Sequence, residues 1–180
     1  MNRVRLYFKD LSEIVGSKGF AVARLIDGDG QRVISIICDK AVTNQLSMRI
    51  TRMPGRERLL PEVLCYLLQA EGSNCMELMV YDIFDGQYQV TLLHRPNLSL
   101  RPIRMSDAVL LHYIAKVPLY IEADLMQRQS TPYVPEQTGI SIPINTLDSK
   151  RLSDELQRAI DAEDYRLASI LHEELRRRTK

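Results

Sequence analysis

An Asp-Gly pair between two runs of strand-forming residues is the feature that most restricts how this chain can fold. Asp85 and Gly86 separate residues 76–84 from residues 87–94, and both runs are rich in apolar, aromatic and β-branched side chains. Asp-Gly readily adopts the positive φ angles of a two-residue turn, so the flanking runs become antiparallel neighbours. The sequence therefore predicts a β-hairpin over residues 76–94.

A second Asp-Gly cluster predicts another hairpin nearer the N-terminus. Residues 27–30 read Asp-Gly-Asp-Gly and separate the apolar runs 19–26 and 33–38, while residues 4–8 alternate like a preceding strand. The cluster is also similar to part of a calcium-binding loop, but it lacks the later Asp or Asn and the closing Glu of such a loop. We therefore favour a turn.

Apolar residues recur at helical spacing in several later segments. The clearest segment covers residues 59–71, where Pro61 suits the first turn and Gly72 follows the last. Its helically spaced apolar residues are Leu60, Val63, Leu64, Leu67 and Leu68. Further helices are predicted over residues 41–50, 106–116 and 122–128, and further strands over residues 98–103 and 118–121. Hairpins interspersed with helices predict an α+β fold with a mixed β-sheet.

The composition changes after residue 128. Residues 130–144 hold three prolines and a glycine with little periodicity, which is typical of a connecting segment. The sequence therefore predicts a first domain over residues 1–128, a Pro-containing linker over residues 129–147 and a helical segment over residues 148–180.

The last segment predicts a short helical hairpin. One helix would present Leu152, Leu156, Ala159 and Ile160, and a second, capped by Asp164, would present Tyr165, Ala168, Leu171 and Leu175. Helices of about a dozen residues are marginal alone. Residues 148–180 hold eight Lys or Arg and eight Asp or Glu, which argues against a nucleic-acid-binding arm. We expect the hairpin to pack against another partner.

Composition limits the class of protein further. The net charge is +1, so no basic excess demands a nucleic-acid partner, although a local patch could still bind one. Cys38, Cys65 and Cys75 form no C-x-x-C pair, which predicts reduced thiols in a cytoplasmic protein. No apolar run approaches the ~20 residues of a membrane span, and the first residues lack a signal-peptide core. His94 and His112 are isolated, which favours structural roles.

The first domain resembles the bacterial bifunctional nuclease domain over about residues 3–128. The matching segments are residues 32–36, residues 79–88 and, most specifically, Arg-Met-Ser-Asp-Ala-Val at residues 104–109, followed by Val-Pro-Leu-Tyr-Ile at residues 117–121. The resemblance implies an α+β fold with mixed sheets, frequent self-association as a homo-oligomer, and degradation of DNA and RNA.

Two segments differ from that family's usual pattern. Residues 37–44 lack the glutamate that the family commonly carries there, and Leu60-Pro61-Glu62 stands where the family commonly has Thr-His-Asp. Only an acid, Glu62, is retained. These differences favour an alternative in which the chain is a non-catalytic interaction or regulatory protein that keeps the family's fold.

Hydrolysis of a phosphodiester needs an activated water and positive charge near the phosphoryl oxygens. Arg104, Ser106 and Asp107 are the first candidates, because arginine can clamp a phosphate and Asp107 could orient water or bind a divalent metal such as Mg or Mn. Asp82 and Glu122 are further candidates. A structural interpretation stays open, in which Ser106 caps a helix, Asp107 complements its dipole and Arg104 pairs locally.

The helical hairpin resembles the UVR motif, which mediates protein–protein contact in excision-repair proteins. The matching residues are Leu152, Leu156, Ala159, Ile160, Asp164, Tyr165, Leu167, Ala168 and residues 171–176. His172-Glu173 stands where the motif usually has Arg-Asp. The resemblance implies capture of a protein partner or self-association, and the alternative is a helical tail that packs on its own domain.

Overall fold

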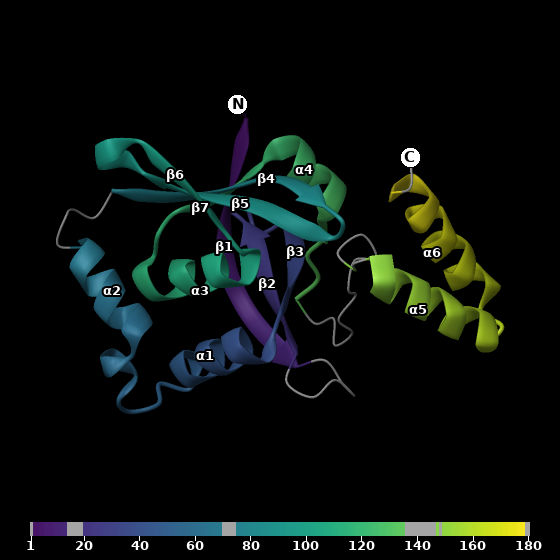
Figure 1. The fold of residues 1–180 in the computed structure, drawn as a ribbon, viewed down its shortest axis with the longest axis horizontal. Helices are drawn as coiled ribbons and strands as arrows, with labels where there is room; N and C mark the ends of the chain where they lie inside the picture. The colour runs from purple at the N-terminus through teal and green to yellow at the C-terminus, as the bar shows by residue number, and fades with distance from the viewer. Residues whose placement is uncertain (1, 14–19, 70–74, 136–146, 148, 179–180) are drawn as a thin grey trace.

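The computed structural model describes residues 2–13, 20–69, 75–135, 147 and 149–178, and it confirms an α+β fold (Figure 1). Eight strands form one sheet in the order β6-β5-β4-β7-β1-β2-β3-β8. The strands are β1 (Arg3–Glu13), β2 (Ala21–Asp27), β3 (Arg32–Cys38), β4 (Met76–Phe84), β5 (Gln87–His94), β6 (Ser99–Ile103), β7 (Leu119–Glu122) and β8 (Thr131–Pro132). The helices are α1 (Lys40–Ile50), α2 (Leu60–Gln69), α3 (Met105–Ala115), α4 (Ala123–Gln129), α5 (Ser149–Asp161) and α6 (Tyr165–Arg178), with short 3-10 turns η1 (Arg56–Arg58) and η2 (Arg95–Asn97).

Both predicted hairpins are present. Asp85 and Gly86 adopt φ angles of 45° and 74° between the antiparallel strands β4 and β5. Between β2 and β3, the Asp27 carboxylate accepts hydrogen bonds from the backbone N–H groups of Gln31 and Arg32, at 2.8 and 3.1 Å. The Asp27 side chain therefore closes a turn, which is the interpretation that we favour over a calcium-binding loop. β4 runs parallel to β7, which makes the sheet mixed.

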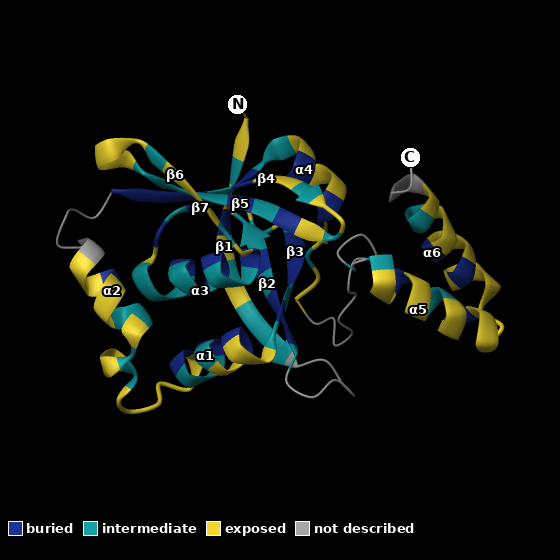
Figure 2. Ribbon diagram, viewed as in Figure 1, coloured by how far each residue is buried: buried dark blue, intermediate teal, exposed yellow. Residues whose placement is uncertain are grey.

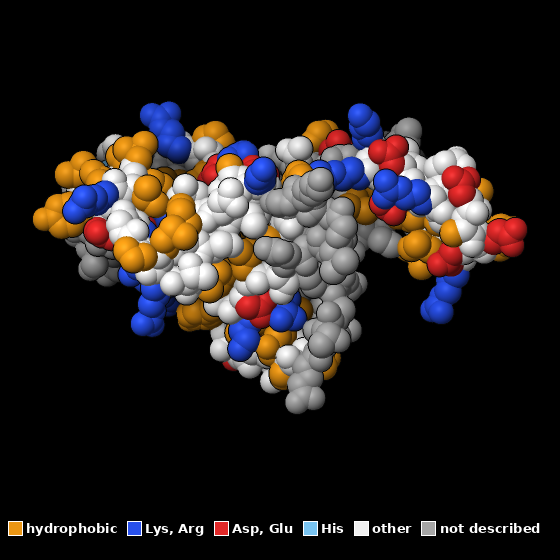
Figure 3. Space-filling model, turned by 90° about the horizontal axis from the view of Figure 1, so that it is seen from below, with side chains coloured by type: hydrophobic (Ala, Val, Ile, Leu, Met, Phe, Trp, Pro, Cys, Tyr) orange, Lys and Arg blue, Asp and Glu red, His pale blue; other side chains and the backbone are white. Residues whose placement is uncertain are grey.

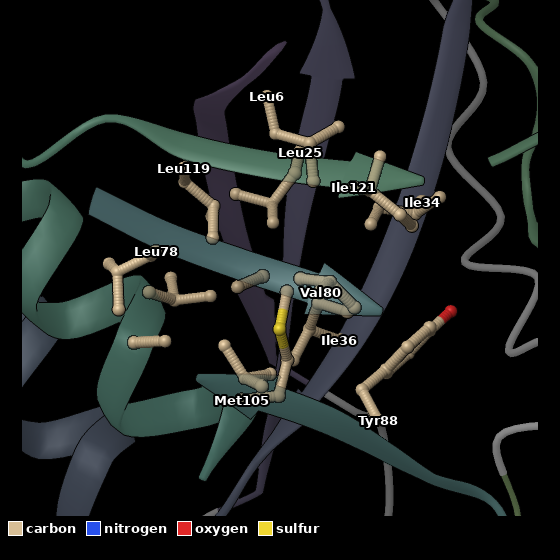
Figure 4. Packing of buried hydrophobic residues seen from close by; sticks show 14 of the residues in the cluster. Leu6, Leu25, Ile34, Ile36, Leu78, Val80, Tyr88, Met105, Leu119 and Ile121 are labelled. Carbon is tan, nitrogen blue, oxygen red and sulfur yellow. The ribbon is translucent and has the colours of Figure 1, made fainter. Parts of the chain in front are cut away.

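A single apolar core lies on one face of the sheet. Its fully buried side chains come from strands far apart in the sequence and converge as Figure 4 shows: Leu6, Leu25, Ile34, Leu78, Leu119 and Ile121. Helices α1, α3 and α4 contribute Leu46, Ala108, Val109 and Leu125 to the same core. Each buried aliphatic side chain stabilises the fold by about 1.5–3 kcal/mol, so the core holds these helices against the strands.

Helix α2 differs from the pattern that its sequence suggests. An apolar helix face normally packs on a core, yet Leu60, Leu64 and Leu67 are 69%, 48% and 58% exposed. Of the side chains described in α2, Cys65 alone is buried (Figure 2). In Figure 3, hydrophobic side chains gather at the end of the molecule where α2 lies. Among the described residues, too few neighbouring elements lie there to cover the helix.

The sheet continues past residue 128 into the segment predicted as a linker. Strand β8 pairs with β3 through Arg32 and Val33. The Arg32 side chain donates from Nε to the hydroxyl of Ser130 at 2.6 Å, and Ser130 is buried. Tyr133 N–H donates to the Gln31 carbonyl at 2.8 Å. Residues 136–146 of the predicted linker lie outside the described residues.

Helices α5 and α6 form the predicted hairpin around a small core of their own. Leu152, Ala159, Ala168 and Leu171 are buried between them, and Leu147, Leu156 and Leu175 pack beside that cluster. Asp164 caps α6, because its Oδ1 accepts from Leu167 N–H at 3.0 Å. Tyr165 and Ile160, expected on the seam, are 71% and 46% exposed. No helix within the described residues is long and apolar enough to cross a membrane.

Candidate functional site

Two helix N-termini meet at Arg104. Asp39 is the N-cap of α1 and accepts from Val42 N–H at 2.9 Å, while Arg104 is the N-cap residue of α3. The Arg104 backbone has the extended conformation that ends β6 and starts the helix, at φ −67° and ψ 144°. Because both helices pack on the same core, their first turns bring Asp39 and Arg104 together.

The Arg104 guanidinium lies between two carboxylates. Its Nε and Nη2 donate to the two oxygens of Asp107 at 2.7 and 3.1 Å, and its Nη1 donates to Asp39 Oδ2 at 3.1 Å. The Arg104 side chain is 65% exposed. Exposed ion pairs contribute only about 0–1 kcal/mol to stability, so stability alone gives little reason for this arrangement.

The pKa values of Arg104 and Asp39 are both shifted from the ordinary values of these side chains. The hydrogen bond to Asp107 raises the pKa of Arg104, and Asp39 adds a smaller contribution in the same direction. The hydrogen bond from Val42 N–H lowers the pKa of Asp39, and the Arg104 charge lowers it further. Asp39 is therefore ionised near neutral pH.

A cavity of about 290 Å³ opens beside Arg104. Strand β3, the start of β5, the first turn of α3 and one residue of α5 enclose it. The polar residues in its wall are Ser35, Gln87, Tyr88, Arg104, Ser106 and Arg151. Two arginines from distant parts of the chain thus line one cavity, which suits an anionic ligand, and the Arg151 guanidinium carbon also lies 5.4 Å from the centroid of the Phe20 ring.

Tyr88 gives this cavity one unusual polar atom. Its ring is 8% exposed, and its hydroxyl has no hydrogen-bond partner within the described part of the chain. Burial raises the pKa of the Tyr88 hydroxyl, so it stays neutral. In Figure 4 the hydroxyl points away from Met105. Tyr88 therefore shapes the wall and carries no charge.

The structure brings the first group of predicted site residues together. Ser106 and Arg104 both line the cavity, and Asp107 holds Arg104 from the first turn of α3. The interpretation of Ser106 as the helix cap is wrong, because α3 begins one residue earlier, at Met105, and Arg104 occupies the N-cap position. Ser106 therefore lies in the first turn of α3 and not at its cap position.

Asp82 and Glu122 lie elsewhere. Asp82 is exposed on β4, where its Oδ1 accepts from the neighbouring Ile83 N–H at 2.8 Å. Glu122 ends β7 and is the N-cap residue of α4. Neither residue is among the described residues that line the Arg104 cavity. The structure separates these two candidates from Arg104, Ser106 and Asp107.

Glu62, the acid retained in the variant Leu-Pro-Glu segment, has a structural partner. Its Oε2 accepts from Nη2 of Arg49 at 2.5 Å, and the Arg49 side chain is only 3% exposed. Arg49 also donates to the carbonyl and side-chain oxygens of Gln45. This ion pair joins α2 to α1 and lies outside the residues that form the cavity.

The donor set at the cavity does not match a divalent metal. No group of three or more His, Cys, Asp or Glu that could hold a metal ion occurs within the described ranges. Asp39 and Asp107, the carboxylates at the first turns of α1 and α3, both pair with Arg104. A cation would have to displace that guanidinium, so no step proposed below passes through a metal.

The isolated histidines and the cysteines have structural surroundings. His112 is buried, and its Nδ1 lies 2.8 Å from the Val117 carbonyl; burial lowers the pKa of its imidazole. His94 Nδ1 lies 2.8 Å from Asn97 Oδ1. Cys38, Cys65 and Cys75 are free and buried. Burial raises the pKa of Cys38 to about 11, so this thiol is unreactive near neutral pH.

Sequence reasoning missed several residues of the site. Asp39 carried a usable signal, because an aspartate directly before a helical segment is a capping residue near a helix N-terminus. Arg151 and Gln87 carried none. They reach the cavity only because the β4–β5 turn and α5 lie side by side, where Ser149 N–H and its hydroxyl donate to Asp85 Oδ1 at 3.2 and 2.5 Å.

Comparison with known families gives one match on this chain. The model of the bifunctional nuclease domain matches residues 24–133, which include Asp39, Asp82, Glu122 and the first turn of α3. It does not reach α5 and α6, and it begins later than the resemblance over residues 3–128 suggested. No curated protein matches the chain. The match covers more than half of the sequence, and the chain therefore belongs to the bifunctional nuclease domain family.

Proposed function

We propose that this protein hydrolyses phosphodiester bonds of DNA or RNA at the cavity beside Arg104. The observation that carries the proposal is the pair of arginines, Arg104 and Arg151, that line one cavity of about 290 Å³. Two arginines would stabilise the charge that develops on the phosphoryl oxygens. Ser106 adds a hydroxyl that could donate to the same oxygens.

Asp39 and Asp107 are the groups that could activate water there. A carboxylate takes a proton from the attacking water, the new P–O bond forms, and the bond to the leaving oxygen breaks as that oxygen gains a proton from solvent. Asp39 is ionised near neutral pH and can accept a proton, but its lowered pKa makes it a weaker base than an ordinary carboxylate. Since Arg104 is largely exposed, its single contact with Asp39 can open to admit a phosphate.

One observation favours a non-catalytic interaction or regulatory protein instead. Each of the three guanidinium nitrogens of Arg104 already donates to a carboxylate, two to Asp107 and one to Asp39. An arginine held in this way joins α1 to α3 without any ligand. In that alternative the family fold is retained and the cavity has no hydrolytic role.

A cleavage assay separates the two functions. Labelled single- and double-stranded DNA and RNA would be incubated with the purified full chain in magnesium, manganese or chelator. If the protein hydrolyses nucleic acid at this site, Arg104→Ala and Asp107→Asn should each lower the cleavage rate about a hundredfold or more. This is the effect typical of removing one donor to the transition state. Arg166→Ala, an exposed arginine of α6, is the control that keeps activity. Absence of cleavage under every condition supports the alternative, and activity that survives both site substitutions refutes the site.

We further propose that α5 and α6 are an interaction module of the UVR type. The hairpin buries four side chains between its helices and leaves Tyr165, Leu167 and Ile170 between 37% and 71% exposed on α6. So small a core is marginal by itself, and the exposed apolar side chains provide a second face for another helical hairpin. The partner is a separate protein or a second copy of this chain.

Two separate apolar clusters support a division of the chain into domains. The sheet and helices α1, α3 and α4 share one cluster, and α5 and α6 share the other. We accordingly propose a first domain that reaches β8, a linker after it and the helical hairpin at the end. Three free, buried cysteines suit a cytoplasmic protein.

A further inference from the structure

The outer face of the sheet, opposite the core, carries arginine and tyrosine side chains. Side chains alternate between the two faces of a strand. In β1, Val4 and Leu6 belong to the core cluster, so Arg3, Arg5 and Tyr7 lie on the other face. Arg3, Arg5 and Tyr7 are all exposed. The adjacent strands β7 and β4 continue this surface (Figure 1).

Tyrosines from the neighbouring strands lie on the same face. In β7, Leu119 and Ile121 are buried in the core, so Tyr120 between them points outward. Tyr120 is in register with Arg5 of β1 and with Met79 of β4. Tyr81, two residues farther along β4, is 46% exposed. The outer face therefore combines arginines of β1 with tyrosines of β1, β7 and β4.

A second cavity, of about 380 Å³, is built into this face. Arg5, Glu77, Arg95, Pro118 and Tyr120 form its wall together with Met76. None of these residues lines the Arg104 cavity. The two cavities are separate features of the first domain.

Positive charge exceeds negative charge around the second cavity. Glu77 is 7% exposed, and its carboxylate accepts from Arg3 and, at 2.6 Å, from Arg95. Two guanidinium groups thus share one buried carboxylate. Arg5 adds a third, and within the described residues no acidic side chain pairs with it. The outward-facing group keeps a net positive charge that would attract an anion.

The rings and guanidinium planes on this face are stacked on one another. The Arg3 guanidinium carbon lies 4.0 Å from the centroid of the Tyr120 ring, and that of Arg5 lies 5.2 Å from the Tyr7 ring. Unpaired nucleobases stack on aromatic rings and on arginine planes, and phosphates pair with arginine. Both parts of a nucleotide therefore find a matching group here.

We infer that this outer sheet face binds single-stranded nucleic acid. Phosphates would contact Arg5 and the exposed parts of Arg3 and Arg95, while bases would stack on Tyr120, Tyr7 and Tyr81. The open face is suited to bases that have left a duplex, because paired bases hide their ring faces. RNA and DNA share these contacts, so both should bind. The inference does not depend on hydrolysis, since a non-catalytic chain could carry the same surface.

Fluorescence anisotropy tests the inference on the full chain, and gel electrophoresis of each probe after the measurement checks that it is still intact. The probes are labelled oligo(U) and oligo(dT) of about 20 nucleotides, which exceeds the 4–16 nucleotides that one small domain usually covers. Arg5→Ala and Tyr120→Leu should each weaken binding about fivefold or more, the least effect expected for a lost stacking or charged contact. Arg5→Ala should also make binding less dependent on salt.

Two further variants sharpen the result. Glu77→Gln removes the one negative charge from the cavity, so it should raise affinity about threefold, a change opposite to that of simple damage to the fold. Arg166→Ala on α6 removes the same charge far from the sheet and should change affinity by less than about twofold. Cleavage of the same probes is assayed in parallel, so a loss of binding in Arg5→Ala or Tyr120→Leu is distinguished from a loss of hydrolysis at the Arg104 cavity.

Equal affinity of the wild type, Arg5→Ala and Tyr120→Leu would overturn the inference. Equal weakening by Arg5→Ala and Arg166→Ala would also overturn it, because that result indicates general attraction to any polyanion. The inference would also be overturned if heparin and duplex DNA displaced the labelled probe as effectively as unlabelled oligo(U) does. The supporting outcome is that the wild type binds oligo(U) or oligo(dT) more tightly than duplex DNA and that Tyr120→Leu loses this preference.

Discussion

Arg104 and Asp39 are separated by 65 residues of sequence, and the 3.1 Å contact between Arg104 Nη1 and Asp39 Oδ2 joins the first turns of α3 and α1. Asp39 has two roles in this contact. Its Oδ1 caps α1, and its Oδ2 accepts from Arg104. The segment that lacks the family's usual glutamate therefore still supplies a carboxylate to the candidate site.

Substitution of Asp39 should separate these two roles. Asp39→Ala removes the cap and the charge, and loss of an N-cap costs about 1 kcal/mol of unfolding free energy. Asp39→Asn keeps an oxygen that can accept from Val42 N–H, so it should cost less than half as much. Urea denaturation followed by circular dichroism measures both. Equal destabilisation by the two variants would show that the charge matters more than the cap.

Glu62→Gln should destabilise the first domain by about 3 kcal/mol, because it leaves the buried Arg49 guanidinium without its ionised partner. The matched control is Glu57→Gln, a change at an exposed acid of η1, which should alter stability by less than about 0.5 kcal/mol. Urea midpoints of the two variants provide the comparison. If both variants unfold at the wild-type midpoint, the ion pair does not anchor α2.

Exposed leucines on α2 should support self-association. Leu64→Lys with Leu67→Lys adds charge to side chains that are 48% and 58% exposed, so the fold should survive while a homo-oligomer dissociates. Multi-angle light scattering gives the molecular mass. Ile170→Lys, at a side chain that is 47% exposed, tests the other candidate surface, on α6 of the hairpin. If only one of these changes lowers the molecular mass, the substituted surface is the one that holds the oligomer together. A wild-type protein that is monomeric would contradict self-association.

The buried His112 should make the protein sensitive to mild acid. Burial lowers the pKa of His112 in the folded chain, whereas in the unfolded chain it is about 6.5. The unfolded state therefore binds more protons as pH falls below about 6.5, and the His112 contribution to stability is lost there. His112→Gln should show a smaller decrease in unfolding free energy between pH 7 and pH 5. An identical decrease in both proteins would exclude His112 as the cause.

Local chemistry explains why much of the fold was predictable. Asp85-Gly86 and the Asp27 turn act within a few residues, so the two hairpins follow from sequence. The α2 apolar stripe shows the limit of this reasoning. Periodicity indicates the helix and its apolar face, but it does not reveal whether another element covers that face, and here Leu60 and Leu67 stay exposed.

The candidate site divides in the same way. Arg104, Ser106 and Asp107 are close in sequence, so one motif identifies them together. Asp82 lies in the matching segment 79–88 and Glu122 directly follows the matching segment 117–121, yet the sheet carries both away from the cavity wall. Periodicity and motifs describe neighbours along the chain and contain no information on distances between strands.

The sequence by itself determined the two hairpin turns, the helical segments, the Arg-x-Ser-Asp-Ala segment at the start of α3 and the amphipathic pair α5 and α6, because each depends on interactions within a few residues. Only the tertiary structure decided that Asp39 meets Arg104, that Arg151 reaches the same cavity, and that Arg5 and Tyr120 share the outer sheet face. Those contacts depend on strand order and register, which burial of one common core sets across the whole domain.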